Sequence, residues 1–353
     1  MMYALIMLAV WGPPHVDTTQ QTDSSTLLQQ GRAEYLGGHF AASERLLLDA
    51  LAALDESDAT QRAKTLSQLG NAYAGEEEFS KAARAYSDSL SIYRRLSDKG
   101  GSALMLHNLG MLYSIQGQNE EALRTLQQAH ELLKSAPKAD TSLTAQVLNG
   151  IGIVHYRQGR NKKAEAFFNQ VLQMISSSGV PFDTASTLNN LGTVYVAERK
   201  FQQAETVLKL ALQVKESEAG PSNPDLIDTL NALGVVYADT GRYREAEDQY
   251  HRALEILAPR SPDFASKHAR ILHALSATYM RAGRQTEAEA ALAQAADIAI
   301  RNLSKEPEMA MIVDDYSAIL RSKGKKKEAE ELHMQAQRAR VAGSLVIRAH
   351  SLL

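Results

Sequence analysis

Apolar residues recur along most of this chain with the spacing of one helical face. Leu188, Leu191 and Tyr195 fall at i, i+3 and i+7, positions that share one side of an α-helix. The segment 204–212 continues the pattern with Ala and Leu residues. The alternation of apolar and polar residues that marks a β-strand is absent from the stretch 24–340. The sequence therefore predicts pairs of amphipathic helices.

This pattern repeats along the chain. The octapeptide LNNLGTVY at 188–195 returns as LNALGVVY at 230–237, and in both cases Ala follows twelve and nineteen residues after the glycine. Weaker copies extend the series, and we call the eight equivalent positions the anchors of repeats 1 to 8. They lie 39 to 42 residues apart: Gly31, Gly70, Gly110, Gly152, Gly192, Gly234, Ser276 and Ser317. Because such a period is typical of stacked repeats, the sequence predicts an apolar segment with a polar linker at 1–23, a repeat array at 24–340 and a C-terminal cap or tail at 341–353.

Glycine and proline indicate where the helices end. Gly117, Gly159, Gly241 and Gly283 each stand seven residues after an anchor, where a left-handed residue can end the first helix. Prolines stand between repeats, at positions 137, 181, 221, 224, 259, 262 and 307. Proline lacks the donor that a helix interior requires. Each repeat is therefore predicted to be a helix–turn–helix hairpin followed by a break.

Small and aromatic residues at fixed positions predict how the hairpins pack. The anchor and the Ala twelve residues later are expected where the two helices come closest, because a larger side chain there would push them apart. The Tyr three residues after the anchor is expected in the seam to the next hairpin, since one hairpin alone cannot bury both faces. The predicted packing residues are Gly70, Tyr73, Ala82, Gly110, Tyr113, Ala122, Gly152, Ala164, Gly192, Tyr195, Ala204, Gly234, Tyr237, Ala246, Tyr279 and Ala288.

The recurring Leu-Gly, Tyr, Ala and Ala positions resemble the tetratricopeptide repeat (TPR). The period exceeds the usual 34 residues of that repeat, and the segment GPSNPD at 220–225 is similar to the kinesin-light-chain-like subgroup. His155 stands where Tyr is typical, and Ser276 and Ser317 stand where Gly or Ala is typical. The resemblance implies an all-α fold, a right-handed superhelical solenoid of about eight TPR hairpins.

The resemblance also implies a concave groove lined by the first helix of each repeat. Three residues before the anchor, repeats 3 to 7 carry His, Asn, Asn, Asn and His, which point away from the packing seam. An amide side chain offers a donor and an acceptor, which suits the two polar groups of an extended peptide backbone. The alternative is structural, with these side chains bonding between adjacent first helices or to loop carbonyls. The candidate peptide-binding residues are His107, Asn108, Asn149, Asn189, Asn190, Asn231, Arg270 and His273.

Some proteins of the resembled family grip a C-terminal carboxylate with Lys, Arg and Asn side chains. Here Lys64, Asn71, Asn108 and Arg270 fall at groove-lining positions, but they are dispersed over distant repeats. The sequence therefore does not favour a carboxylate clamp. Acidic residues at 228, 239, 314 and 315 are compatible with a basic partner segment.

Composition narrows the possible functions. The 41 acidic and 38 basic residues give a net charge of −3, which argues against non-specific binding of nucleic acid. The absence of Cys excludes disulfides, Cys-ligated metal and thiol catalysis. No His-Glu-x-x-His, P-loop or Gly-x-Ser-x-Gly motif occurs. Gly150 and Gly152 match half of a dinucleotide-binding fingerprint, but they lie inside a predicted repeat helix, where packing is the better explanation. The sequence predicts no cofactor, no metal and no enzymatic activity.

The two ends leave alternatives open. Residues 3–11 are nearly all apolar, too few for a membrane-spanning helix of about 20 residues. They fit a secretory signal, a frayed hydrophobic tail or a segment that docks on the first helix. A soluble protein, cytoplasmic or exported, is therefore expected. The apolar residues of the tail, Leu345, Val346, Ile347, Leu352 and Leu353, suit either a cap for the last repeat or a short membrane or partner motif.

Together these features predict a non-enzymatic scaffold or adaptor that binds a protein or peptide segment in its groove. The alternative is a regulatory receptor for a small peptide signal that acts by a change in superhelix pitch. The sequence leaves the partner's identity and the oligomeric state undetermined.

Overall fold

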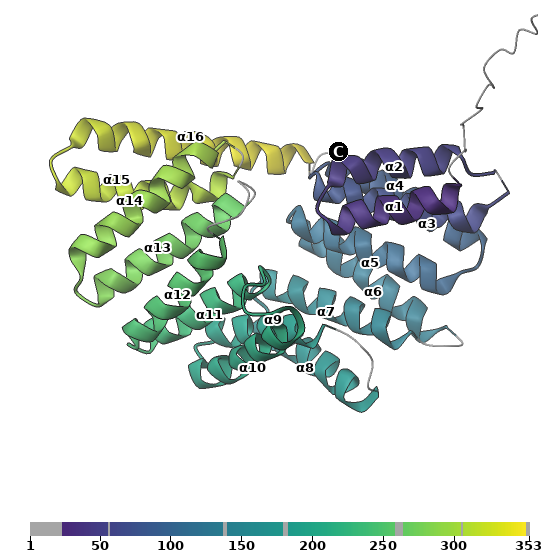
Figure 1. Ribbon diagram of the computed structural model, residues 1–353, viewed down its shortest axis with the longest axis horizontal. Coiled ribbons are helices and arrows are strands. Elements are labelled where there is room, and N and C mark those ends of the chain that lie inside the picture. Colours follow the sequence, from purple (N-terminus) through teal and green to yellow (C-terminus); the bar gives the residue numbers. More distant parts are fainter. Residues whose placement is uncertain are drawn as a thin grey trace, which may run out of the picture. The chain divides into compact units, whose positions relative to one another are not determined.

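The computed structural model describes residues 23–55, 57–136, 140–178, 183–257, 264–304 and 306–350, with side chains to residue 342. Throughout these residues the regular elements are helices (Figure 1), so the all-α expectation is confirmed. They are α1 (Ser24–Leu36), α2 (Phe40–Ala52), α3 (Ala59–Gly75), α4 (Phe79–Arg95), α5 (Lys99–Ile115), α6 (Asn119–Lys134), α7 (Thr141–Arg157), α8 (Asn161–Ser178), α9 (Thr184–Ala197), α10 (Phe201–Ala219), α11 (Leu226–Asp239), α12 (Tyr243–Leu257), α13 (Ala265–Arg281), α14 (Gln285–Asn302), the short 3-10 helix η2 (Pro307–Met309), α15 (Ala310–Ser322) and α16 (Lys326–His350).

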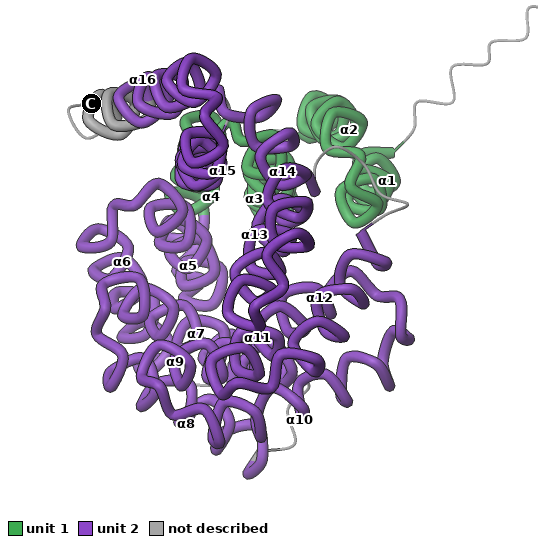
Figure 2. The backbone as a smooth tube through the Cα atoms, turned by 90° about the vertical axis from the view of Figure 1, so that its left-hand side faces the viewer, with its two compact units in different colours: residues 1–92 green, residues 93–353 purple. Residues whose placement is uncertain are grey.

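The helices form two compact units, residues 1–92 and 93–353 (Figure 2). Each anchor lies in the first helix of a hairpin, from Gly31 in α1 to Ser317 in α15. The first unit contains repeat 1 and most of repeat 2, and the second contains repeats 3 to 8. Within the second unit, the second helix of each repeat packs on the first helix of the next.

The anchor glycines are buried because the second helix of the same repeat covers them. A Cβ on Gly234 would lie 2.6 Å from Cζ of Tyr250, and one on Gly152 would lie 2.6 Å from Cε1 of Phe168. Such distances are far below van der Waals contact. The Ala twelve residues after each anchor in repeats 2 to 8 is fully buried: Ala82, Ala122, Ala164, Ala204, Ala246, Ala288 and Ala329. The two helices therefore approach closely because both carry small residues at the crossing.

Repeat 7 solves the same packing problem with a serine. The hydroxyl of Ser276 donates to the carbonyl of Ala288 at 2.7 Å, so its polar atom is satisfied at the crossing. The residue opposite is Leu292, which is smaller than Tyr250 at the equivalent place in repeat 6. Leucine also stands opposite the glycine anchors of repeats 1, 3 and 5, so an aromatic ring at this place is a feature of repeats 2, 4 and 6.

A left-handed residue stands seven positions after every anchor. Glycine fills six of these places, Gly38, Gly117, Gly159, Gly241, Gly283 and Gly324, with φ between 70° and 81°. Repeats 2 and 5 use Glu77 (φ 60°) and Arg199 (φ 58°) instead. A side chain makes this conformation costly, so these two turns hold local strain.

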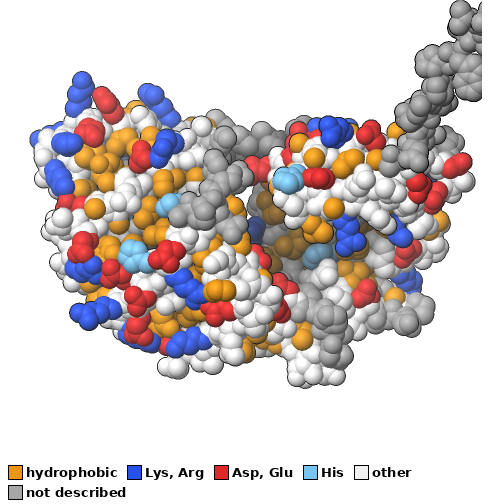
Figure 3. All heavy atoms as spheres, in the orientation of Figure 1, with side chains coloured by type: hydrophobic (Ala, Val, Ile, Leu, Met, Phe, Trp, Pro, Cys, Tyr) orange, Lys and Arg blue, Asp and Glu red, His pale blue; other side chains and the backbone are white. Residues whose placement is uncertain are grey.

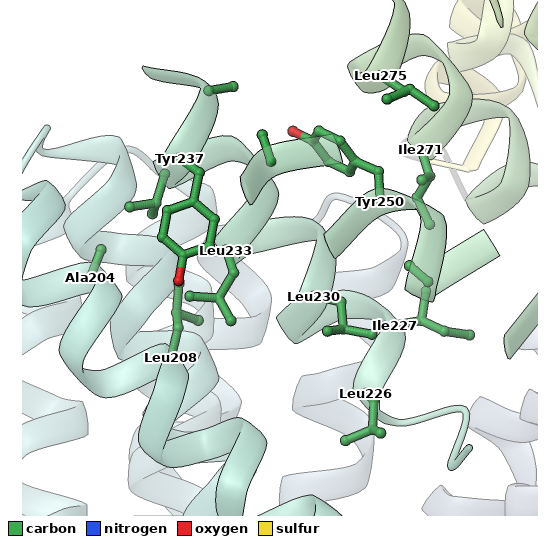
Figure 4. Close-up of a cluster of buried hydrophobic side chains, with 14 of the residues drawn as sticks. Ala204, Leu208, Leu226, Ile227, Leu230, Leu233, Tyr237, Tyr250, Ile271 and Leu275 are labelled. Atoms are coloured by element: carbon green, nitrogen blue, oxygen red, sulfur yellow. The ribbon is translucent and has the colours of Figure 1, made fainter. Parts of the chain in front are cut away.

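Figure 4 shows the core at the centre of the second unit. Tyr237 extends from α11 toward Leu208 of α10 and lies beside Leu233, whereas Leu230 lies further along α11 near Leu226 and Ile227. Tyr195, Tyr237 and Tyr279 are each less than 10% exposed at 7%, 4% and 7%, whereas Tyr73 and Tyr113 are half-buried. Stability in this unit arises from contacts between neighbouring repeats.

The last repeat ends in polar contacts. His333 of α16 bonds to Asp314 at 2.8 Å, and Arg340 forms an ion pair with the same carboxylate. Gln337 in turn bonds to His333 at 2.9 Å. The C-terminal tail proposed as an apolar cap, the segment 1–22 and the prolines at 137, 181, 259 and 262 all lie outside the described side chains.

Candidate functional site

The candidate groove residues of the second unit lie on its first helices. The ladder face is defined here as the residues three positions before the anchors of repeats 3 to 7: His107 of α5, Asn149 of α7, Asn189 of α9, Asn231 of α11 and His273 of α13. All five side chains are half-buried. The next position along each helix carries Asn108, Gly150, Asn190, Ala232 and Ala274, and in repeat 8 Asp315.

Neighbouring first helices meet in one register. Asn190 Nδ2 donates to Asn149 Oδ1 at 3.3 Å, from repeat 5 to repeat 4. His273 Nε2 bonds to Asp315 Oδ2 at 2.8 Å, between repeats 7 and 8. Each contact joins a ladder residue to the position two before the anchor of the next repeat. Asn149 and His273 therefore bond between adjacent first helices, as the structural alternative to ligand binding expects.

The other three ladder residues face small residues in this register. A Cβ on Gly150 would lie 3.4 Å from Cε1 of His107, so a glycine stands opposite that ring. The same register places Ala232 opposite Asn189 and Ala274 opposite Asn231. These small residues offer the ladder no polar side-chain partner.

Two of these three side chains hold shielded polar atoms. Asn189 Oδ1 and His107 Nδ1 are buried and have no hydrogen-bond partner within the described part of the chain. Burial lowers the pKa of His107 to about 4, so its ring is neutral at pH 7. Buried polar groups of this kind are costly unless they are bonded.

The remaining candidates are not brought together. Lys64 and Asn71 belong to the first compact unit, and Asn71 Oδ1 already accepts from the Tyr86 hydroxyl at 2.7 Å. Arg270 is exposed on α13. These residues form no common clamp within either unit.

The four acidic residues near the later repeats are paired with the chain's own basic groups. Asp228 bonds to Lys267 at 2.8 Å, and Asp239 bonds to Arg281 at 2.6 Å. Asp314 and Asp315 bond to His333 and His273 as described above. These internal pairs weaken the case for a basic partner segment.

A second recurring arrangement was not recognised in the sequence. We call it the turn clamp: a cation eight positions after the anchor pairs with a Glu of the preceding repeat, thirteen positions after that repeat's anchor. Arg242 bonds to Glu205 at 2.8 Å and Arg284 to Glu247 at 2.6 Å. Lys200 pairs with Glu165 at 2.9 Å. The clamps therefore join repeats 4 to 7 in one register.

Each clamp cation also lies over a tyrosine of its own repeat. The guanidinium of Arg284 is 4.3 Å from the ring centre of Tyr279, close enough for a cation–π interaction. The Tyr279 hydroxyl donates to Glu247 at 2.8 Å. The same distance of 4.3 Å separates Arg242 from the Tyr237 ring, and Lys200 is 5.3 Å from that of Tyr195.

These contacts shift the ionisation of the clamp. The Arg284 guanidinium holds the pKa of Glu247 below its usual range, against burial, and Tyr279 adds a hydrogen bond in the same direction. Burial together with Glu247 raises the pKa of Tyr279 to about 12. Acidic and basic side chains are interspersed over α11 to α14 (Figure 3). The sequence signal was a Glu directly after the Ala that stands twelve residues from the anchor, in Glu165, Glu205, Glu247 and Glu289.

Metal-binding clusters and membrane-spanning helices are both absent from the described residues. No group of three or more His, Asp or Glu side chains there is placed to hold a metal ion. Of the helices described, none has the length and apolar character needed to cross a membrane.

Comparison with known proteins identifies the family of the central repeats. Family models described as tetratricopeptide repeat match residues 101–177, 183–258 and 268–307, more than half of the chain. No curated protein sequence matches the chain.

Solved structures share the fold at low sequence identity. The apo form of the quorum sensor NprR from B. thuringiensis is 15% identical, with a TM-score of 0.68 over 90% of this chain and 87% of that one. The Rap conjugation gene regulator of the plasmid pLS20, solved with a Phr peptide, is 15% identical, with a TM-score of 0.59 over 92% and 96%. BtubC from P. vanneervenii is 24% identical, with a TM-score of 0.54 over 62% and 90%.

Proposed function

Because the chain belongs to the tetratricopeptide-repeat family, we propose that it is a non-enzymatic scaffold that binds an extended protein segment on its ladder face. The observation that carries this proposal is the pairing register of the first helices. In this register His107, Asn189 and Asn231 face Gly150, Ala232 and Ala274, which leaves them without a polar side chain opposite.

A peptide backbone could bond these shielded atoms once the half-buried side chains turn toward it. Asn189 Oδ1 accepts a hydrogen bond, and its amide nitrogen donates one, which matches the N–H and C=O of an extended residue. The neutral ring of His107 likewise has one donor and one acceptor nitrogen. Bonding to a backbone satisfies these atoms and recovers part of the cost of their burial.

The spacing sets the length of the segment. Neighbouring helices pack about 8–10 Å apart, so three repeat steps from His107 to Asn231 span about 30 Å. An extended chain rises about 3.3 Å per residue. The segment between the outer contacts therefore has about nine residues.

Apolar side chains accompany the ladder one helical turn further along. Met111, Ile153 and Val235 stand four residues after ladder positions and are half-buried, and residues four apart share one helix face. They offer contact to apolar side chains of the segment. The ligand expected here alternates backbone contacts with apolar side chains and needs no terminal carboxylate.

The test is selection of binders from a displayed library of random 12-residue peptides on the full chain. Affinities of the selected peptides are then measured by calorimetry for wild type and for Asn189→Ala with Asn231→Ala. Loss of bonds to two buried amides is expected to weaken binding by at least about tenfold, since each is worth roughly 1 kcal/mol.

The matched control removes two amides from second helices. Gln173→Ala with Gln213→Ala alters exposed side chains of α8 and α10 and should leave affinity unchanged. Full affinity in the Asn189→Ala, Asn231→Ala variant, with its helicity intact, would contradict the assignment of the ladder face.

A regulatory receptor for a small peptide signal is the second candidate. The likeness of fold to NprR, a quorum sensor, and to a Rap regulator solved with a peptide covers nearly the whole chain and favours it. A receptor needs a shift of its mean geometry on binding, whereas a scaffold keeps its mean dimensions even where the bound segment restricts its motion. Small-angle scattering with and without a selected peptide separates the two, because only the receptor shifts its mean dimensions.

A further inference from the structure

The turn clamp holds neighbouring repeats together at the edge where the two helices of each hairpin turn. It joins repeats 4 and 5 through Glu165 and Lys200, repeats 5 and 6 through Glu205 and Arg242, and repeats 6 and 7 through Glu247 and Arg284. Glu205 and Glu247 are only 12% and 20% exposed. Partly buried, bridged carboxylates of this kind fix the angle between the hairpins more firmly than exposed pairs do.

The clamp is missing where repeat 3 meets repeat 4, whereas between repeats 7 and 8 Glu289 still pairs across the junction, with Lys323. Leu123 occupies the position of the Glu, and His155 occupies that of the Tyr. Arg160, the equivalent cation, reaches only Glu120, at 3.6 Å. That carboxylate also accepts from Gln158 Nε2 at 2.9 Å, so the contact is long and shared.

A solvent-open groove lies at the turn edge of this junction. It has a volume of about 550 Å³ and is lined on the side of repeat 3 by Gln116, Gly117, Asn119 and Glu120, and on the side of repeat 4 by Gln158 and Arg160. Close packing normally holds adjacent elements in one arrangement. At this edge, the two hairpins are held instead by a few polar side chains.

The inner side of the same junction is closely packed through a glycine. A Cβ on Gly150 of α7 would lie 3.0 Å from Sδ of Met111 and 3.4 Å from Cε1 of His107, both of α5. With no side chain on Gly150, the contact consists of a flexible thioether and a ring edge against backbone. Such a contact can act as a pivot while the turn edge opens or narrows.

We propose that the junction of repeats 3 and 4 is the flexion point of the second compact unit, and that a bound segment fixes its angle. The second part rests on the proposed function, because a segment reaching from His107 to Asn189 crosses this junction. Flexion changes the separation of these two ladder residues. Repeats 4 to 7, joined by clamps, move as one body.

The junction can be measured by spin labelling. The chain has no native cysteine, so pairs of introduced cysteines report alone. Glu131→Cys with Gln213→Cys spans the unclamped junction and one clamped junction, whereas Gln173→Cys with Glu255→Cys spans two clamped junctions. All four positions are exposed and equivalent, 21 residues after their anchors. Pulsed electron–electron double resonance on the full chain gives the distribution of distances between the two spin labels of each pair.

The first pair is expected to show the broader distribution. Installing the clamp with Leu123→Glu and His155→Tyr should narrow it to the width of the second pair, which stays unchanged. The converse variant, Glu205→Gln with Tyr237→His, removes the clamp between repeats 5 and 6 and should broaden the second pair. It keeps the proposal testable if the first variant fails to fold.

Equal widths for the two pairs in the wild type would overturn the flexion point, as would an unchanged first pair in a folded clamp-installed variant. These measurements contain no peptide, so they stand or fall separately from the proposed function. A library-selected peptide that binds should then narrow the first pair. Binding without narrowing would overturn the second part of the proposal and leave the binding function intact.

Discussion

Replacing Gly234 by serine tests how closely the two helices of a repeat are packed. A Cβ at this position would lie 2.6 Å from Cζ of Tyr250, whereas carbon atoms prefer about 3.5–4.0 Å. The tyrosine is 1% exposed, so its ring has no free space into which it can move by about 1 Å. Overpacking of this kind costs about 1–3 kcal/mol.

The substitution also removes a helix-interior glycine, which returns about 0.5 kcal/mol of helix propensity. Overpacking is the larger effect, and a net loss of about 1–2 kcal/mol is expected. Tyr250→Leu alone should also destabilise, because it removes buried ring volume. The double variant should lose less than the sum, since repeat 7 already pairs Ser276 with Leu292 and bonds the serine hydroxyl to Ala288.

The assay is urea unfolding followed by circular dichroism, with midpoints compared at constant slope. The cycle of Gly234→Ser, Tyr250→Leu and the double variant should give a favourable coupling of about 1 kcal/mol or more. Additive effects, within about 0.5 kcal/mol, would refute the idea that the anchor and the ring opposite it compete for one space.

Three further outcomes follow from single side chains. Glu77→Gly should stabilise the chain by about 0.5–1 kcal/mol in thermal unfolding, because the strain of φ 60° exceeds the added entropy of the unfolded chain. Gly117→Ala is the matched reverse change and should lower the unfolding midpoint. A lower midpoint for Glu77→Gly would count against strain in this turn. Glu247→Gln should cost about 1 kcal/mol at pH 7, where the lowered carboxylate pKa stabilises the fold. That difference is complete above the ordinary pKa of 4.5 and closes as pH falls through the lowered value, so a pH-independent difference would exclude the ion pair as its source. The free energy of unfolding should fall from pH 6.5 toward pH 4, because His107 of the unfolded chain binds a proton that the folded ring, with a pKa of about 4, does not bind. His107→Gln should flatten this dependence of stability on pH. An unchanged dependence would show that the ring is solvated.

The helices and their repeat were predictable because their signals are local and periodic. Gly192, Ala204 and Tyr195 return at fixed spacing, and the period alone places each anchor in the first helix of a hairpin. The left-handed turns were predictable where glycine fills them. Glu77 and Arg199 occupy the same place but have no such local signal, since neither residue favours that conformation.

The pairing of the ladder residues was not predictable from spacing. Whether Asn149 faces a ligand or Asn190 depends on the offset between neighbouring first helices, which is set by packing across the whole repeat. The turn clamp is likewise a contact between residues about 37 positions apart, as in Arg242 and Glu205. It becomes visible in the sequence only when equivalent positions of successive repeats are compared.

The most direct test of the account is to locate a library-selected peptide on the chain. A photoreactive amino acid is placed at each peptide position in turn, and the cross-linked residues are identified by mass spectrometry. Cross-links are expected in α5, α7, α9 and α11, near His107, Asn189 and Asn231 and in that order along the peptide. Cross-links confined to the second helices of the repeats, α6, α8, α10 and α12, would contradict this expectation.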